Sequence, residues 1–142
     1  MKKIICFIIV LCTLMVITGC QSNDSLSYEQ FTENEEIFKF LNYAFYESSN
    51  EVAVVAKLDH DKKEVVEIKE FDTVIPTAQT FSKIERGMSV YEVVELVGLP
   101  TRSVTFGFAS TDFETDDGVW RVQWDTDLSK EIMTVISVVA VQ

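Results

Sequence analysis

The sequence predicts an α+β fold in which two short helices pack on a small antiparallel sheet, preceded by a helix and a β-hairpin. Three observations lead to this prediction. A capped apolar stripe over Val90–Val97 indicates a helix, and alternating polar and apolar residues after Pro100 indicate strands. A helical stripe followed by alternating residues also occurs earlier, between residues 31 and 75. The expected core is therefore a short pair of helices that leads into a sheet.

The first twenty residues have the pattern of an export signal. Two lysines precede an apolar run over residues 4–18, and a glycine and Cys20 follow. The run is short for a membrane span, which needs about 20 apolar residues. Its ending, I-T-G-C, resembles a bacterial lipobox. This resemblance implies that residues 1–19 are a lipoprotein signal peptide and that Cys20 carries a lipid; the alternative is an uncleaved anchor helix.

The cysteines then exclude several kinds of chemistry. Cys6 and Cys12 lie in the leader, so a lipidated Cys20 leaves no free thiol in the mature chain. A disulfide framework, a cysteine zinc site and a cysteine nucleophile are therefore not expected. The sequence also lacks the phosphate-loop, dinucleotide and zinc-protease motifs, so we expect no cofactor.

A tether and a helix are expected next. Residues 20–30 are polar and aperiodic, which is typical of a flexible tether. Thr32 and Glu35 have the spacing of a capping box, which predicts a helix near residues 33–47. The apolar stripe of this helix would consist of Ile37, Phe38, Leu41, Ala44 and Phe45.

A hairpin completes the N-terminal unit, residues 31–75. Apolar and polar residues alternate over residues 51–71, and the polar segment 59–63 interrupts the alternation. Because strands have a side-chain period of two, this pattern predicts two strands joined by a turn.

Two short helices open the second unit, residues 80–142. An S-x-x-E capping box marks the start of each, and the predicted helices are Ser82–Arg86 and Val90–Val97. Gly98 suits the residue that ends a helix, and Pro100 cannot continue one.

Three strands are expected after the helices, over residues 101–109, 118–125 and 131–141. An acidic loop over residues 109–118 would join the first two. The last strand is apolar on both sides, which is more typical of a central strand than of an edge strand.

The second unit resembles the SmpA/OmlA family of small lipoproteins, and the related repeats of β-lactamase inhibitory proteins. The resemblance covers residues 81–141 and rests on Ile84, Gly87, Met88, Ser89, Glu92, Val93, Leu96, Gly98 and Pro100, with Gly107 and Trp120 as looser matches. It implies an α-α-β-β-β domain that contacts other proteins through its sheet face, strand loops and helix edge. Residues 31–75 are a departure, because family members of the barrel assembly machine carry less sequence before the motif.

The charge of the chain limits its partners. After loss of the leader, ten Lys and Arg residues face 23 Asp and Glu residues, a net charge of −13. Nucleic acid is not expected as a partner, because phosphate contacts need basic side chains. Anionic lipid head groups would also repel the chain, so membrane attachment is expected through the lipid on Cys20.

The candidate side chains for chemistry are few. His60 is the one histidine, and its place between two aspartates in a turn indicates a solvated residue rather than a catalytic one. The acidic loop supplies a weak candidate cation site with four possible ligands, Asp112, Glu114, Asp116 and Asp117. The candidate partner contacts are Tyr91, Met88, Phe113, Trp120 and Trp124, since aromatic residues dominate protein interfaces. For the aromatic residues on strands, a place in the core is the alternative.

The sequence thus predicts a lipid-anchored, non-enzymatic binding or scaffold protein of the bacterial envelope. It would be exported and held on the outer face of the cell membrane or, in a cell with two membranes, in the outer membrane; its partner would be an unknown envelope protein. One alternative is a surface-held inhibitor of an enzyme such as a β-lactamase or protease, with the acidic loop inserted into its target. Another is a lipoprotein that binds a small ligand in a concave pocket.

Overall fold

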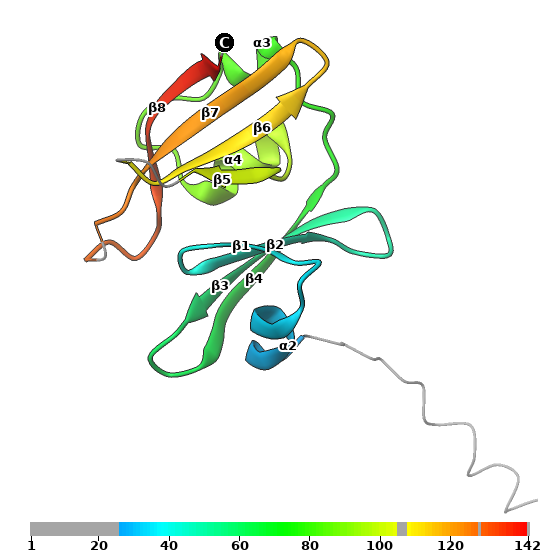
Figure 1. Ribbon diagram of the computed structural model, residues 1–142, viewed down its shortest axis with the longest axis vertical. Coiled ribbons are helices and arrows are strands. Elements are labelled where there is room, and N and C mark those ends of the chain that lie inside the picture. The colour runs from blue at the N-terminus through cyan, green and yellow to red at the C-terminus, as the bar shows by residue number, and fades with distance from the viewer. Residues whose placement is uncertain (1–25, 105–107, 128, 142) are drawn as a thin grey trace, which may run out of the picture.

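The computed structural model describes residues 26–104, 108–127 and 129–141 (Figure 1). The chain is mostly β, with 46% strand and 16% helix, and its strands form two four-stranded antiparallel sheets. The predicted α+β fold is therefore wrong. Within the described residues, three short helices are found: α2 (Tyr28–Glu33), α3 (Ala78–Phe81) and α4 (Val90–Val97).

The N-terminal sheet is a meander of four strands in the order β1-β2-β3-β4. Its strands are β1 (Phe38–Phe40), β2 (Tyr43–Glu47), β3 (Val52–Asp59) and β4 (Glu64–Asp72). The predicted hairpin over residues 51–71 is confirmed as β3 and β4. The predicted helix over residues 33–47 is wrong, because β1 and β2 occupy most of that segment.

The helix prediction failed because β2 is buried on both faces. Tyr43 and Phe45 belong to the main core, whereas Ala44 and Tyr46 pack with α2 on the other side. A strand with two buried faces gives a continuous apolar run, which a helical stripe also fits. The true helix, α2, starts earlier, at a capping box of Ser27 and Gln30. The predicted tether over residues 20–30 thus overlaps α2 at its end.

The C-terminal sheet has the order β5-β6-β7-β8. Its strands are β5 (Arg102–Val104), β6 (Ser110–Thr115), β7 (Gly118–Asp125) and β8 (Thr134–Val141). The predicted strand over residues 118–125 is confirmed. The predicted acidic loop over residues 109–118 is instead strand β6 and a turn, and β8 is an edge strand rather than a central one.

The two helices before this sheet differ in how well the sequence predicts them. Helix α4 is confirmed, with the capping box of Ser89 and Glu92 and with Gly98 at its end. The predicted helix Ser82–Arg86 is wrong, since α3 occupies residues 78–81 and is capped by Thr77 and Thr80. A T-x-x-T pair makes the same reciprocal hydrogen bonds as a Ser–Glu box, so the stronger-looking S-x-x-E spacing misled the prediction.

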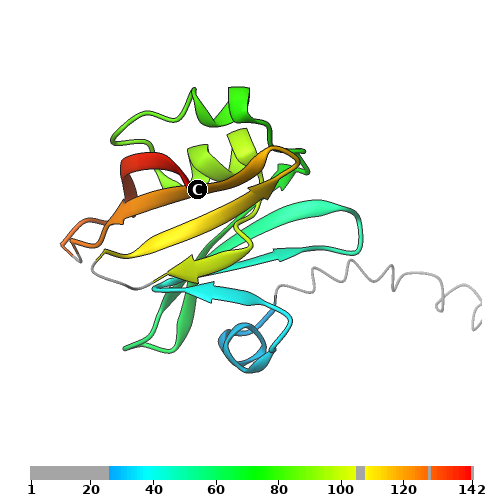
Figure 2. The same ribbon diagram turned by 45° about the horizontal axis from the view of Figure 1, so that its top comes forward.

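One main core joins the two sheets. It contains Phe45 and Val55 of the N-terminal sheet, Val94 of α4, and Val122 and Val135 of the C-terminal sheet. A smaller second core lies on the other face of the N-terminal sheet, under α2. Figure 2 shows α2 on the side of that sheet away from the C-terminal sheet. The N-terminal sheet is therefore covered on both faces.

Candidate functional site

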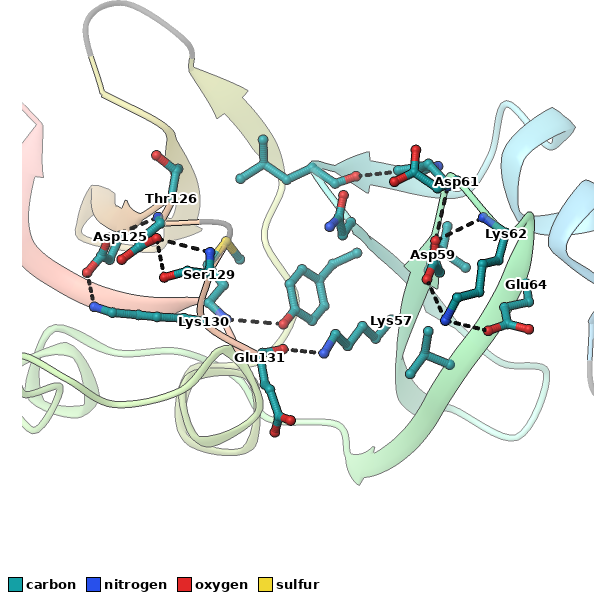
Figure 3. A pocket seen from close by; sticks show the side chains of 18 residues that line it. Lys57, Asp59, Asp61, Lys62, Glu64, Asp125, Thr126, Ser129, Lys130 and Glu131 are labelled. Atoms are coloured by element: carbon teal, nitrogen blue, oxygen red, sulfur yellow. Dashed lines mark hydrogen bonds and ion pairs between the residues drawn. The ribbon is translucent and has the colours of Figure 1, made fainter.

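A cleft of about 620 Å³ lies between the two sheets (Figure 3). One wall is the turn between β3 and β4, and the other is the connection between β7 and β8. Tyr43 and Lys57 lie at its base. The cleft exists only because the main core holds the two sheets together.

The first wall is shaped by Asp59. Its carboxylate accepts the backbone N–H groups of Asp61 and Lys62, each at 3.0 Å, which fixes a tight Asx turn. The Lys62 ammonium lies 3.4 Å from Asp59 and 3.7 Å from Glu64. The backbone hydrogen bond from Lys62 is the main reason why the pKa of Asp59 is lowered. The turn thus presents an ionised, ordered carboxylate to the cleft.

In the second wall, Asp125 and Asp127 accept backbone N–H groups in the same way as Asp59 does in the first. Asp125 accepts the N–H of Asp127 at 3.1 Å, and Asp127 accepts the N–H of Ser129 at 3.0 Å. The Lys130 ammonium pairs with Asp125, which lowers the pKa of Asp125 and raises that of Lys130. Lysines and carboxylates therefore stand on both walls, as Figure 3 shows.

Two hydrogen bonds cross the base of the cleft from one sheet to the other. The backbone N–H of Met133 donates to the phenol oxygen of Tyr43 at 3.1 Å. The Lys57 ammonium donates to the carbonyl of Glu131. Burial of Tyr43 raises the pKa of its phenol, so the group stays neutral at physiological pH. These contacts fix the distance between the walls.

Both ring nitrogens of His60, on the rim, are engaged. Its Nε2 lies 3.1 Å from the carbonyl oxygen of Leu41, and its Nδ1 lies 2.8 Å from the hydroxyl of Tyr28. Because a carbonyl can only accept, Nε2 carries the proton and Nδ1 accepts from Tyr28. His60 thus ties α2 to the turns of the N-terminal sheet, and this contact was not visible in the sequence.

Two exposed apolar side chains line the same cleft. Leu41 is 44% exposed and Val66 is 51% exposed. Leu41 adopts a φ of +52° in the β1–β2 turn, a conformation that is uncommon for a branched apolar residue. The sequence predicted Leu41 on a helix and Val66 on a strand of the hairpin, and neither was predicted as a site residue. Asn42, a residue type that is common in turns, is the one local signal that could have indicated this turn and so Leu41.

The predicted partner contacts lie elsewhere. Tyr91, Phe113 and Trp124 are buried in the main core, and Met88 and Trp120 are partly buried against it. Trp120 stacks on Phe81, which also meets Phe113 edge to face. The sequence places Tyr91 off the valine stripe of its helix, which predicts that it faces out or flanks the sheet; with 5% exposure and a hydrogen bond to Glu67 of β4, it does not face out. None of the five lines the cleft.

The predicted cation loop also has a different role. Asp112 lies on β6, is 1% exposed, and is bound by Arg121 at 2.7 Å and Arg102 at 2.6 Å. Its carboxylate is therefore already neutralised, and hydrogen bonding from Arg121 is the main cause of its lowered pKa. Among the residues that the structure describes, no three His, Cys, Asp or Glu side chains are grouped so that they could hold a metal ion.

The predicted lipidation site, Cys20, lies outside the described residues. Within the described ranges, no helix has the length and apolar character needed to span a membrane. Comparisons with family models, with curated proteins and with solved structures found no match to this chain. The cleft is thus the feature of the described fold on which a functional proposal can be built.

Proposed function

We propose that this chain is a lipid-anchored, non-enzymatic binding module of a bacterial envelope, and that its cleft receives a segment of a partner protein. The observation that carries this proposal is the pairing of Leu41 and Val66 with charged walls in one cleft. Exposed apolar residues within a polar rim are typical of surfaces that bind other proteins. The two apolar side chains would anchor the partner, and the walls would orient it.

The charges of the walls favour a partner segment with basic residues. The carboxylates of Asp59 and Asp125 are held ionised, and the mature chain carries a charge of −13. A negative surface attracts a positive partner over a distance and speeds its encounter. The lysines of the walls are each close to a carboxylate, so they leave the negative character in excess.

A binding role is also supported by how the potentially reactive groups are used. His60 has a hydrogen-bond partner at each ring nitrogen, which leaves neither nitrogen free to act as a general base. Asp59 and Asp125 each accept backbone N–H groups and pair with a lysine. Such carboxylates shape turns, and their lowered pKa values are unsuited to general acid catalysis at neutral pH.

The proposed lipid anchor is based on the sequence alone, namely on the export-signal pattern of residues 1–19 and on Cys20 after it. The resemblance of residues 81–141 to SmpA/OmlA lipoproteins belongs to the same proposal, although four strands follow the two helices where the family pattern implies three. The N-terminal sheet is the departure from that family, and it supplies one wall of the cleft. The partner would therefore be specific to chains that carry this extra sheet.

The test is capture of the partner in living cells. A photo-crosslinking residue is placed singly at Leu41 and at Val66, with Phe108 as the matched control, because Phe108 is apolar and exposed but lies outside the cleft. We expect one dominant adduct from the two cleft positions and none from Phe108. A Cys20→Ala form, which cannot receive the lipid, should lose both its membrane attachment and the adduct. An equal adduct from Phe108, or no adduct from a folded and anchored chain, would contradict the proposal.

A small ligand is the second candidate, and the volume of the cleft favours it. Ligand sites typically measure about 300–1,000 Å³, and this cleft falls in that range. Its walls are more charged than most ligand sites, which is why we place it second. A rise in thermal midpoint with a small charged compound, lost in Lys57→Ala, would favour it. The inhibitor alternative rested on an inserted acidic loop, and that segment is strand β6 and the turn after it.

A further inference from the structure

We propose that β8 pairs antiparallel with β8 of a second copy of this chain, which joins two C-terminal sheets into one continuous sheet. This goes beyond the proposed function, because β8 is not part of the cleft. It rests on the edges of the sheets, on the direction of the peptide groups of β8, and on the composition of the strand.

The four edge strands of the two sheets are protected differently. Strands β1 and β5 have three residues each, and β4 carries five charged residues in nine. Short or charged edges resist pairing with another chain. Strand β8 has neither protection, since its eight residues, T-V-I-S-V-V-A-V, include no charge, proline or glycine. It is the exception among the edges of the described sheets.

The start of β8 is covered from within the chain. Gly87 donates its N–H to the carbonyl of Val135 at 2.8 Å, and Val135 donates to the carbonyl of Met88 at 2.8 Å. Beyond Val135, within the described residues, β7 is the one strand that pairs with β8. The free part of the edge is therefore the second half of the strand.

The register shows which peptide groups point outward there. Trp124 donates its N–H to Ala109, toward the β6 side, so by alternation Arg121 points toward β8. Val139 is opposite Arg121 and points back to β7. Val138 and Ala140, on either side of Val139, therefore direct their N–H and C=O groups away from the sheet.

These two outward residues fit a two-fold axis. If Val139 lies opposite Val139 of the second copy, Val138 of each copy faces Ala140 of the other. Each such pair exchanges both N–H···O=C bonds of an antiparallel ladder. The Val139 side chains, 44% exposed in one chain, would meet across the axis. The interface is isologous, which is the commonest symmetry of oligomers.

A second copy is favoured as the partner because the register of β8 is self-complementary and the strand itself carries no charge. An uncharged, β-prone strand brings no charge against β8, and β8 itself is such a strand. With Val139 at the axis, none of the side chains from Val138 to Ala140 brings a charge into the contact. The acidic charges lie elsewhere, and salt screens charges beyond about 8 Å at physiological ionic strength.

The test uses the full chain in its own membrane with Val139→Cys and mild oxidation. We expect a disulfide-linked dimer, since opposed residues of this kind bring their Cα atoms within disulfide reach. The controls are the unsubstituted chain, in which the proposed lipid on Cys20 leaves no free thiol, and Glu95→Cys, an exposed position on α4. Adding Ala140→Pro should abolish the dimer, because it removes an outward N–H and no bond to β7. Ala140→Ser, which keeps the N–H, should not.

A second measurement protects the test against misfolding of the proline variant. Tagged and untagged copies of the full chain are co-expressed and purified on the tag. Val139→Lys in both copies, or Val139→Glu in both, should prevent co-purification, because like charges would face each other across the axis. Co-expression of one Val139→Lys copy with one Val139→Glu copy should restore co-purification, because opposite charges would then face each other. A dimer that survives Ala140→Pro, a crosslink to a different protein, or no dimer above the controls in a folded chain would overturn the proposal.

Discussion

The hydroxyl of Tyr91 on α4 donates a hydrogen bond of 2.8 Å to the carboxylate of Glu67 on β4. The contact links the helix of the second unit to the sheet of the first. The Lys69 ammonium lies 4.1 Å from the centre of the Tyr91 ring, and Tyr43 meets that ring edge to face. Burial raises the pKa of Tyr91, so the phenol keeps its proton and remains a donor. Tyr91 thus links helix α4 to the N-terminal sheet.

Tyr91→Phe should weaken this link without leaving a buried group unpaired. Glu67 is partly exposed, so water can replace the lost donor. We expect the free energy of unfolding to fall by about 1 kcal/mol in urea denaturation. The pKa of Glu67, which the Tyr91 hydrogen bond lowers, should rise in a carboxylate titration by NMR. An unchanged pKa of Glu67 would show that the bond is not formed in solution.

Tyr43→Phe should cost more than Tyr91→Phe, although both delete one hydroxyl. Tyr43 accepts from the backbone N–H of Met133, and both residues are buried. Losing the acceptor leaves that N–H without a partner. We therefore expect the free energy of unfolding to fall by about 2 kcal/mol. The two variants are compared in one set of urea denaturation curves. The reverse order of stability would contradict the placement of these hydroxyls.

Asp112→Asn should destabilise the C-terminal sheet in a pH-dependent way. The pKa of Asp112 is lowered in the folded chain, mainly by hydrogen bonding from Arg121. Its contribution is therefore fully present above the unfolded pKa of about 3.9 and is lost as the pH falls through the folded value. We expect the variant to lose about 2 kcal/mol at pH 7. The difference from the parent chain should shrink below pH 4, and a constant difference would count against the two arginine contacts.

Gly98→Ala and Gly87→Ala form a matched pair. Both glycines have positive φ, at +82° for Gly98 and +93° for Gly87, so both variants carry backbone strain. A Cβ on Gly98 would also lie 3.0 Å from the carbonyl oxygen of Val74, whereas one on Gly87 would have open space. We expect Gly98→Ala to cost about 1–3 kcal/mol and Gly87→Ala to cost less. The thermal unfolding midpoints of the two variants test this difference. Equal midpoints would contradict the close approach of the Val74 carbonyl to Gly98.

Local signals were read correctly where a cap was strong or where β-branched residues favoured a strand. The box of Ser89 and Glu92 located α4, and the alternation after residue 51 located β3 and β4. The signals failed for β2, which is buried on both faces and lacks the β-branched residues that mark β3. They also failed for the position of β8 in its sheet, which depends on strand pairing. Apolar residues on both faces of a strand indicate that it is buried, but they do not show whether the strand lies at the centre or at the edge of the sheet.

The candidate site was largely hidden from the sequence for the same reason. The cleft brings together residues about 70 positions apart, such as Lys57 and Glu131, and no local pattern encodes that pairing. The acidic run that suggested a cation loop contained Asp112, whose neutralising partners are Arg102 and Arg121 on neighbouring strands. Only the strand register brings these three residues together.

The cleft requires that the two sheets form one body, and hydrogen exchange on the full chain in detergent micelles measures this directly. The slowest amides of β3 and of β7 should exchange with the same free energy of opening, because they share the main core. Tyr91→Phe should lower both values equally. Different free energies for β3 and β7, with Tyr91→Phe lowering only one of them, would mean that the sheets open separately and that no lasting cleft lies between them.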